Sequence, residues 1–283
     1  MDFTDIRRLT ITALFSDDFL YERLVLKGGT ALSLVYGLTD RTSVDLDFSL
    51  AADFEDLAEA KDHMFRAIRE HFDSAGYVMI DERLEPKPRI DGADVKPWWG
   101  GYELRFKLID RQSYGKLKHR PDKLSIAALV TGMGQNRVFS VDFSKHEYVE
   151  GRLEREFDHF SILVYSPEMI VVEKLRAICQ QMEAYPHKGR RNARARDFYD
   201  IYKVVTSCRI DLGTAENQEL VRHIFDAKQV PLSFLRDIGA ERDFHRTDWP
   251  AVVDSTEGEL ESFDFYFDFL QQQVRLLEPL WME

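Results

Sequence analysis

Apolar and polar positions alternate in short blocks over the first part of the chain. Residues 24–26 form an apolar run that ends at Gly28 and Gly29, and residues 30–38 then have the spacing of a short helix. After a polar loop, residues 44–49 alternate apolar and polar side chains with a period of two, which is typical of a strand. The pattern predicts a strand, a glycine turn, a helix and a second strand.

Further strands and helices follow without regular βαβ alternation. Helical spacing extends over residues 53–72, and another helix is predicted near 124–130. Strands are predicted at 77–84, 102–109, 138–143 and 157–165. This order favours an α+β fold with a mixed sheet over a doubly wound one.

The pattern changes character at Ser166 and Pro167. Serine as N-cap and proline at the first helical position predict a helix through about residue 182, and nearly everything after it has helical spacing. Apolar residues over 260–281 recur in steps of three and four, although the phenylalanines within 263–269 also alternate and leave a strand open there. We therefore expect two domains, residues 1–165 and a mostly helical 166–283.

Composition narrows the class of protein. Of the 283 residues, 44% are hydrophobic and 31% charged, which excludes disordered and fibrous classes. There is no apolar run long enough to span a bilayer, and an acidic N-terminus replaces the basic start of a signal peptide. The two cysteines belong to no metal-binding or disulfide pattern. We expect a cytoplasmic globular protein that does not enter membranes.

The formal charge of −12 argues against a generally polycationic nucleic-acid binder, but two stretches are basic. Residues 174–196 contain seven lysines and arginines against Glu183 alone. Residues 103–123 contain seven against three acidic residues. Both stretches could receive phosphate groups, and solvated surface faces are the commoner explanation of such runs.

Asp45 and Asp47 stand two apart on a predicted strand, so their side chains leave the same face within reach of one hard cation such as Mg²⁺. Taken alone, the pair is more often a solvated acidic edge. Gly28 and Gly29 lie just upstream at a strand-to-helix turn, where backbone N–H groups can face an anion. The combination favours a site that binds a metal and phosphate.

Four motifs together resemble the AbiEii/AbiGii toxin family of nucleotidyltransferases, relatives of DNA polymerase β. They are Lys27-Gly28-Gly29-Thr30-Ala31-Leu32; Arg41, Ser43 and Asp45-Leu46-Asp47-Phe48; Glu173-Lys174-Leu175-Arg176-Ala177; and Arg196-Asp197-Phe198-Tyr199-Asp200. The resemblance implies a bilobed protein: a nucleotidyltransferase domain, then a helical domain that completes the active site.

The resemblance also implies roles for individual residues. Lys27, Gly28, Gly29, Thr30, Ser43 and Lys174 would bind the nucleotide, and Asp45 and Asp47 would bind the metal. A third carboxylate is expected on a neighbouring strand, and Asp142 is the candidate because of its strand pattern. Lys174 and Asp197 would complete the catalytic set.

Lys174 and Asp197 stand out without the family as well. On helical wheels each falls within the apolar arc of its own helix, so both charges point inward and need partners. On the pattern alone, a structural ion pair between the two helices is as good an interpretation as an active-site role. The resemblance favours the active site.

The resulting hypothesis is an NTP-dependent nucleotidyltransferase toxin. With Mg²⁺ (or Mn²⁺) at Asp45, Asp47 and Asp142, it would transfer a nucleoside monophosphate to an acceptor hydroxyl and release pyrophosphate. The expected acceptor is RNA, with a tRNA 3′ end favoured, held by Arg190, Arg191 and Arg194; a cognate antitoxin is the implied protein partner. The alternatives are a non-catalytic nucleotide- or partner-binding module on the same scaffold and a protein-nucleotidylating enzyme.

Overall fold

The computed structural model describes residues 1–39, 45–88, 96, 98–130, 136–185 and 190–282. The chain divides into two compact units. The first comprises residues 1–30, 44–149 and 153–164, and the second comprises residues 31–43, 150–152 and 165–283. Each unit has its own elements, and they are described in turn.

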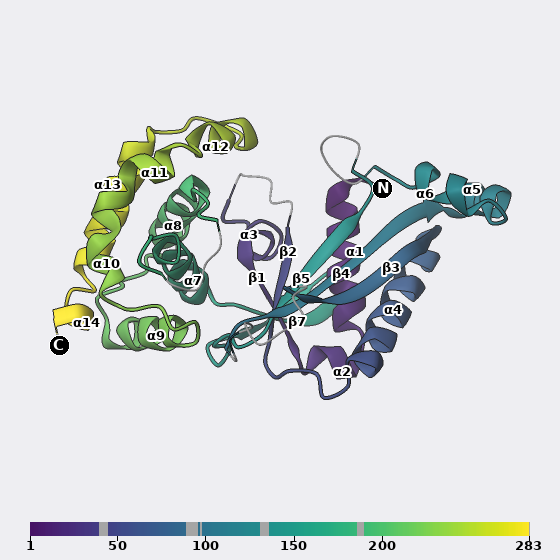
Figure 1. Cartoon of the computed structure of the whole chain (residues 1–283), viewed down its shortest axis with the longest axis horizontal. Coiled ribbons are helices and arrows are strands. Elements are labelled where there is room, and N and C mark those ends of the chain that lie inside the picture. The colour runs from purple at the N-terminus through teal and green to yellow at the C-terminus, as the bar shows by residue number, and fades with distance from the viewer. Residues whose placement is uncertain (40–44, 89–95, 97, 131–135, 186–189, 283) are drawn as a thin grey trace. The chain divides into compact units, whose positions relative to one another are not determined.

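A seven-stranded mixed sheet forms the first unit, with strand order β3-β4-β5-β2-β1-β7-β6 (Figure 1). The strands are β1 (Leu24–Lys27), β2 (Leu46–Leu50), β3 (Tyr77–Lys87), β4 (Gly101–Asp110), β5 (Phe139–Ser144), β6 (Leu153–Phe157) and β7 (Phe160–Val164). The pairs β2–β5 and β1–β7 are parallel and the other pairs are antiparallel. The predicted α+β class with a mixed sheet is confirmed.

One face of this sheet is covered by α1 (Phe3–Phe15) and α4 (Leu57–Ser74), with the short α2 (Asp18–Tyr21) between them. Aromatic rings join the helices to the sheet: Phe15 of α1 lies 6.0 Å from Phe48, and Phe72 of α4 lies 5.9 Å from Phe106. Phe48 also stacks on Phe143 at 5.5 Å. These rings belong to the buried core, so the alternate residues of β2, β4 and β5 project from the opposite face.

Three sequence predictions need correction. The strand predicted at 157–165 is present as β7, and an unpredicted β6 precedes it in a hairpin, because Asp158 and His159 both take left-handed backbone angles, φ 49° and 68°, and reverse the chain. The helix predicted near 124–130 is α6 (Pro121–Ala127), preceded by an unpredicted α5 (Arg111–Leu117). The helix predicted at 30–38 is the short α3 (Gly28–Thr30), continued by a π-helical turn through Val35.

The second unit is helical. Its first helix, α7 (Pro167–Cys179), begins as predicted, with the Ser166 side chain accepting from the Met169 N–H. The other helices are α8 (Ala195–Cys208), α9 (Ala215–Asp226), α10 (Phe234–Asp237), a 3-10 turn (Ile238–Glu241), α11 (Arg242–Arg246), α12 (Trp249–Ser255), α13 (Phe263–Arg275) and α14 (Pro279–Met282). The phenylalanine-rich segment is thus helical, and Phe198 of α8 stacks on Phe267 of α13 at 5.3 Å. None of the helices in the described ranges has the length and apolar character needed to cross a membrane.

Replacing Phe48 tests the assigned core of the sheet. Phe48→Ala removes a fully buried ring that contacts Phe15 and Phe143, and we expect the free energy of unfolding to fall by about 3–5 kcal/mol. Ile126 on α6 is 70% exposed, so Ile126→Ala should change it by no more than about 0.5 kcal/mol. Urea denaturation of both variants measures the difference. Equal losses would contradict the assigned core.

Candidate active site

The glycine turn predicted at residue 28 brings the Asp47 carboxylate against the backbone. Gly28 follows β1 with φ +72°, a conformation that side chains disfavour. A Cβ atom at this position would lie 2.8 Å from Oδ2 of Asp47. Only glycine therefore allows the carboxylate to approach the turn this closely.

Thr30 links the same turn to the start of β2. Its buried hydroxyl donates to the backbone carbonyl of Asp45 at 2.6 Å, so the side chain positions the first aspartate of the pair. Asp45 is exposed and directly precedes β2, whereas Asp47 is half-buried within it. Ser43, predicted to bind nucleotide, and the neighbouring Arg41 lie outside the described residues.

The sheet register aligns four charged residues from four neighbouring strands. Lys27 of β1 is paired with Asp47 of β2, Asp47 with Asp142 of β5, and Asp142 with Glu103 of β4. Paired residues project from the same face of a sheet, here the face opposite the phenylalanine core. We call these four residues the charged row. The sequence pattern had suggested Asp47 and Asp142 separately, and the register places them on adjacent strands.

Neighbouring side chains neutralise the charged row. The Lys87 ammonium donates to both oxygens of Asp142, at 2.7 and 2.8 Å, and Arg105 lies 2.6 Å from the carboxylate of Glu103. Lys27, predicted to bind nucleotide, pairs at 3.3 Å with Glu147, and both side chains are buried. The roles of Lys87, Glu103 and Glu147 could not be predicted from the sequence, because they depend on pairing across the sheet and on side chains far apart along the chain.

The donor chemistry of the row suits a hard divalent cation. Asp47 and Asp142 supply carboxylate oxygens, the ligands that Mg²⁺ prefers, and the Lys87 ammonium already places one positive charge on Asp142. Over the part of the chain that the structure describes, no three His, Cys, Asp or Glu side chains converge into a ready-made metal centre. Asp45, Asp47 and Asp142 thus have the right chemistry for a metal, and its ligands are not gathered in advance.

A second charged cluster lies inside the helical unit. Nζ of Lys174 on α7 donates to Asp197 at 2.9 Å and to Asp200 at 2.7 Å, both on α8. The two carboxylate side chains are 1% and 0% exposed, and Arg194 also bonds to Asp197. The predicted inward orientation of Lys174 and Asp197 is present, with their mutual contact.

Electrostatics keep Asp197 ionised. Burial raises the pKa of its carboxyl, but the positive charges of Arg194 and Lys174 outweigh burial and hold that pKa well below its usual range. Asp200 is a residue that sequence analysis did not single out. The available signal was its spacing: three positions after Asp197, it lies on the same face of one helix.

The three arginines predicted to hold RNA have different surroundings. Arg190 is exposed. Arg191 contacts Glu183 at 3.2 Å and Glu241, and its guanidinium lies 4.1 Å from the centre of the Phe244 ring. Arg194 bonds to Asp197. Arg191 and Arg194 therefore take part in ion pairs within the helical unit.

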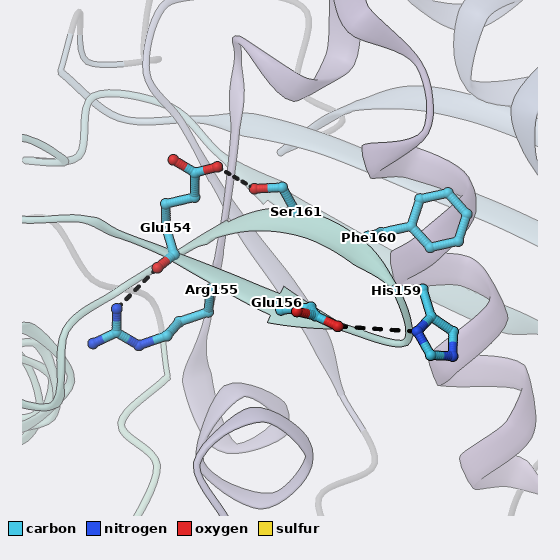
Figure 2. Close-up of a pocket in the computed structure, with 6 residues that line it drawn as sticks. All are labelled: Glu154, Arg155, Glu156, His159, Phe160 and Ser161. Atoms are coloured by element: carbon cyan, nitrogen blue, oxygen red, sulfur yellow. Dashed lines mark hydrogen bonds and ion pairs between the residues drawn. The ribbon is translucent and has the colours of Figure 1, made fainter.

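A separate shallow pocket lies on the hairpin of β6 and β7. Figure 2 shows its lining residues, in which Glu154 bonds to Ser161 and Glu156 lies 3.9 Å from His159. None of the predicted site residues lines it. The hairpin pocket is thus not part of the candidate site.

A mixed sheet with an aspartate pair after a glycine turn, followed by helices with a buried lysine and aspartate, is the arrangement that the four sequence motifs led us to expect of a nucleotidyltransferase. The sequence matches the family "Nucleotidyl transferase AbiEii toxin, Type IV TA system" over residues 11–269. The chain belongs to this family of NTP-using nucleotidyltransferase toxins, whose type IV systems include a cognate antitoxin.

Two solved structures are similar to the chain. MenT4, a nucleotidyltransferase toxin from Mycobacterium tuberculosis, has 17% sequence identity and a TM-score of 0.45, covering 98% of this chain and 83% of MenT4. An antigenic nucleotidyltransferase-like protein from Paracoccidioides brasiliensis has 15% identity and a TM-score of 0.39, covering 82% of this chain and 93% of its own. Among curated proteins there is no significant sequence match.

Gly28 offers a matched test of the close approach of Asp47. Gly28→Ala should lower the rate of nucleotidyl transfer at least about tenfold, because the new Cβ displaces the Asp47 carboxylate, while the left-handed backbone costs on the order of 1 kcal/mol. Gly76→Ala is the control, since Gly76 has φ +85° with open space around its Cβ position. Transfer assays and thermal unfolding separate the effects. If both variants lose activity equally, backbone strain alone explains the loss.

Lys174 can be tested as the centre of the buried cluster. Lys174→Met leaves Asp197 with Arg194 but removes the ammonium from the buried Asp200, and we expect unfolding free energy to fall by about 3–5 kcal/mol. Adding Asp200→Asn removes the buried negative charge that Lys174 had balanced and should recover about 2 kcal/mol or more. Urea denaturation measures both variants. A Lys174→Met protein as stable as the parent would contradict this account.

Proposed function

We propose that the protein transfers a nucleoside monophosphate from an NTP to a hydroxyl group of RNA, with a tRNA 3′ end favoured, in a reaction that depends on Mg²⁺. In this step the acceptor oxygen forms a bond to the α-phosphorus, the bond to the β-phosphate oxygen breaks, and pyrophosphate leaves. The observation that carries the proposal is the in-register pairing of Asp47 with Asp142, together with the close approach of Asp47 to the Gly28 turn.

Asp45, Asp47 and Asp142 would hold the metal ion, with Mn²⁺ as an alternative. When bound, such an ion supplies positive charge to the triphosphate and to the leaving pyrophosphate. The Thr30 hydroxyl holds the backbone of Asp45, and the glycine turn admits the Asp47 carboxylate. Asp142 would also accept the proton of the acceptor hydroxyl, once Lys87 no longer occupies both of its oxygens.

The remaining predicted residues have complementary roles in this proposal. The N-terminal domain, residues 1–165, would carry the metal and triphosphate, with Lys27, Gly28, Gly29, Thr30 and Ser43 on the nucleotide. The helical domain, residues 166–283, would complete the active site through Lys174, which neutralises phosphate charge, and Asp197, which orients Lys174. Arg190, Arg191 and Arg194 would contact RNA, and at Arg191 and Arg194 a phosphate would compete with existing carboxylate partners.

The deciding experiment incubates the protein with each labelled NTP, Mg²⁺ and total cellular RNA and protein. We expect label on RNA, and Asp47→Asn should lower the rate by about a thousandfold or more, because metal-assisted charge stabilisation is worth several kcal/mol. Asp62→Asn changes the same charge at an exposed position of α4 and should retain activity. The unfolding temperature of both variants should stay close to that of the parent.

Four outcomes would count against the proposal. Label on protein side chains would favour protein nucleotidylation, and absence of any label would favour a non-catalytic binding module. Full activity of Asp47→Asn would remove the metal assignment. A folded, active Lys174→Met/Asp200→Asn variant would exclude Lys174 from the reaction.

A further inference from the structure

The strands β3 and β4 carry positive charge away from the charged row. Beyond Glu103, the residues of β4 on the same face are Arg105, Lys107 and the buried Ile109. Arg83 of β3 is paired directly with Arg105, so two like charges lie opposite each other. Arg105 contacts Glu103 at 2.6 Å and Lys107 contacts Asp81 at 2.8 Å, so part of this charge is already neutralised. The exposed Arg83 and the helices that follow β4 carry the rest.

The helices α5 and α6 extend this charge. Four exposed side chains lie on and between them: Lys116, Lys118, Arg120 and Lys123. In the ranges that the structure describes, none of the four forms an ion pair, whereas the neighbouring Arg111 contacts Asp73 at 2.5 Å. Asp122 is the one acidic residue between 111 and 123. We call residues 111–127, which lie between β4 and β5 along the chain, the insertion. The four residues are the insertion lysines and arginine.

Hydrogen bonds hold this insertion on the sheet. Asp81, at a bulge of β3 with φ 55°, accepts from Lys107 at 2.8 Å and from Ser125 of α6 at 2.9 Å. At the other helix, the Asp110 side chain caps α5 by accepting from the Ser113 N–H at 2.8 Å. The helices that carry the basic side chains are therefore fixed to β3 and β4 by hydrogen bonds.

The distance between the insertion and the charged row limits which ligands can contact both. Glu103 belongs to the row and Asp110 ends the strand seven residues later. At roughly 3.3 Å per residue, β4 spans about 23 Å between them. A nucleoside triphosphate bound at the row is too short to reach the insertion, so an anion that contacts both must be a longer polymer.

We propose that the β3–β4 face and the insertion lysines and arginine bind the sugar-phosphate backbone of the RNA acceptor, at a distance from the hydroxyl that reacts. This inference rests on the proposed function for the nature of the acceptor. A strip of separate positive charges matches regularly spaced phosphates. An anionic membrane fits less well, because, among the residues that the structure describes, the large apolar side chains exposed beside the strip are Ile126 and Val130, too few to enter a bilayer.

The test compares two variants with the same change in net charge. The first is Lys116→Gln/Lys118→Gln/Arg120→Gln/Lys123→Gln. The control is Lys61→Gln/Arg209→Gln/Arg236→Gln/Arg275→Gln, at four exposed positions elsewhere. Affinity for purified total tRNA is measured by titration at several salt concentrations, and thermal unfolding verifies that both variants fold.

The insertion variant should bind tRNA about tenfold or more weakly than the control. Its slope of log affinity against log salt concentration should also be shallower by roughly three, because each lost phosphate contact reduces that slope by about 0.7–0.9. Equal tRNA affinity of the two variants, while the parent still labels RNA, would overturn this inference and leave the proposed function standing. Binding of the parent to phosphatidylserine vesicles but not to tRNA would overturn it in favour of a membrane. A parent that binds tRNA but labels only protein would overturn the proposed function and, with it, the assignment of this surface to an acceptor.

Discussion

The register of the parallel pair β2–β5 is the constraint on which the rest of the candidate site depends. Asp47 and Asp142 are far apart in sequence, and no tight turn can join parallel strands. Their alignment is set on the other face of the sheet, where Phe48 stacks on Phe143 within the core. A slip of β5 by one residue would bury Asp142 among phenylalanines and expose Phe143 on the charged face, so the core enforces the positions of the carboxylates.

The local sequence pattern was sufficient to predict some structural elements and insufficient to predict others. The glycine turn, the alternation of β2 and the Ser166 cap are encoded by neighbouring residues, and each is present. The partnership of Lys87 with Asp142 was not predictable, because it joins strands that meet only in the folded sheet. The hairpin at Asp158 and His159 was missed since neither residue is the glycine or asparagine that usually marks such a turn.

The buried cluster in the helical unit shows how charges inside a core are made tolerable. Lys174 and Arg194 carry two positive charges, and Asp197 and Asp200 carry two negative ones, so these four side chains balance. An isolated buried charge would cost far more than the pair. The amphipathic pattern identified Lys174 and Asp197 as inward-facing charges. It could not separate a structural ion pair from a catalytic one, because the same contacts between the two side chains would serve both roles.

Ion pairing also distinguishes two basic stretches that look alike in sequence. Near Lys174, folding itself uses much of the positive charge, because Arg191 and Arg194 bind carboxylates within the helical unit. On and between α5 and α6, the side chains of Lys116, Lys118 and Arg120 are exposed to solvent and have no such contacts in the described chain. A paired cation adds little to the potential beyond its partner, whereas an unpaired one contributes over about a Debye length, roughly 8 Å at physiological salt. The protein has a net charge of −12. The stretch at α5 and α6, which folding leaves unneutralised, therefore attracts an approaching polyanion more strongly than the stretch near Lys174.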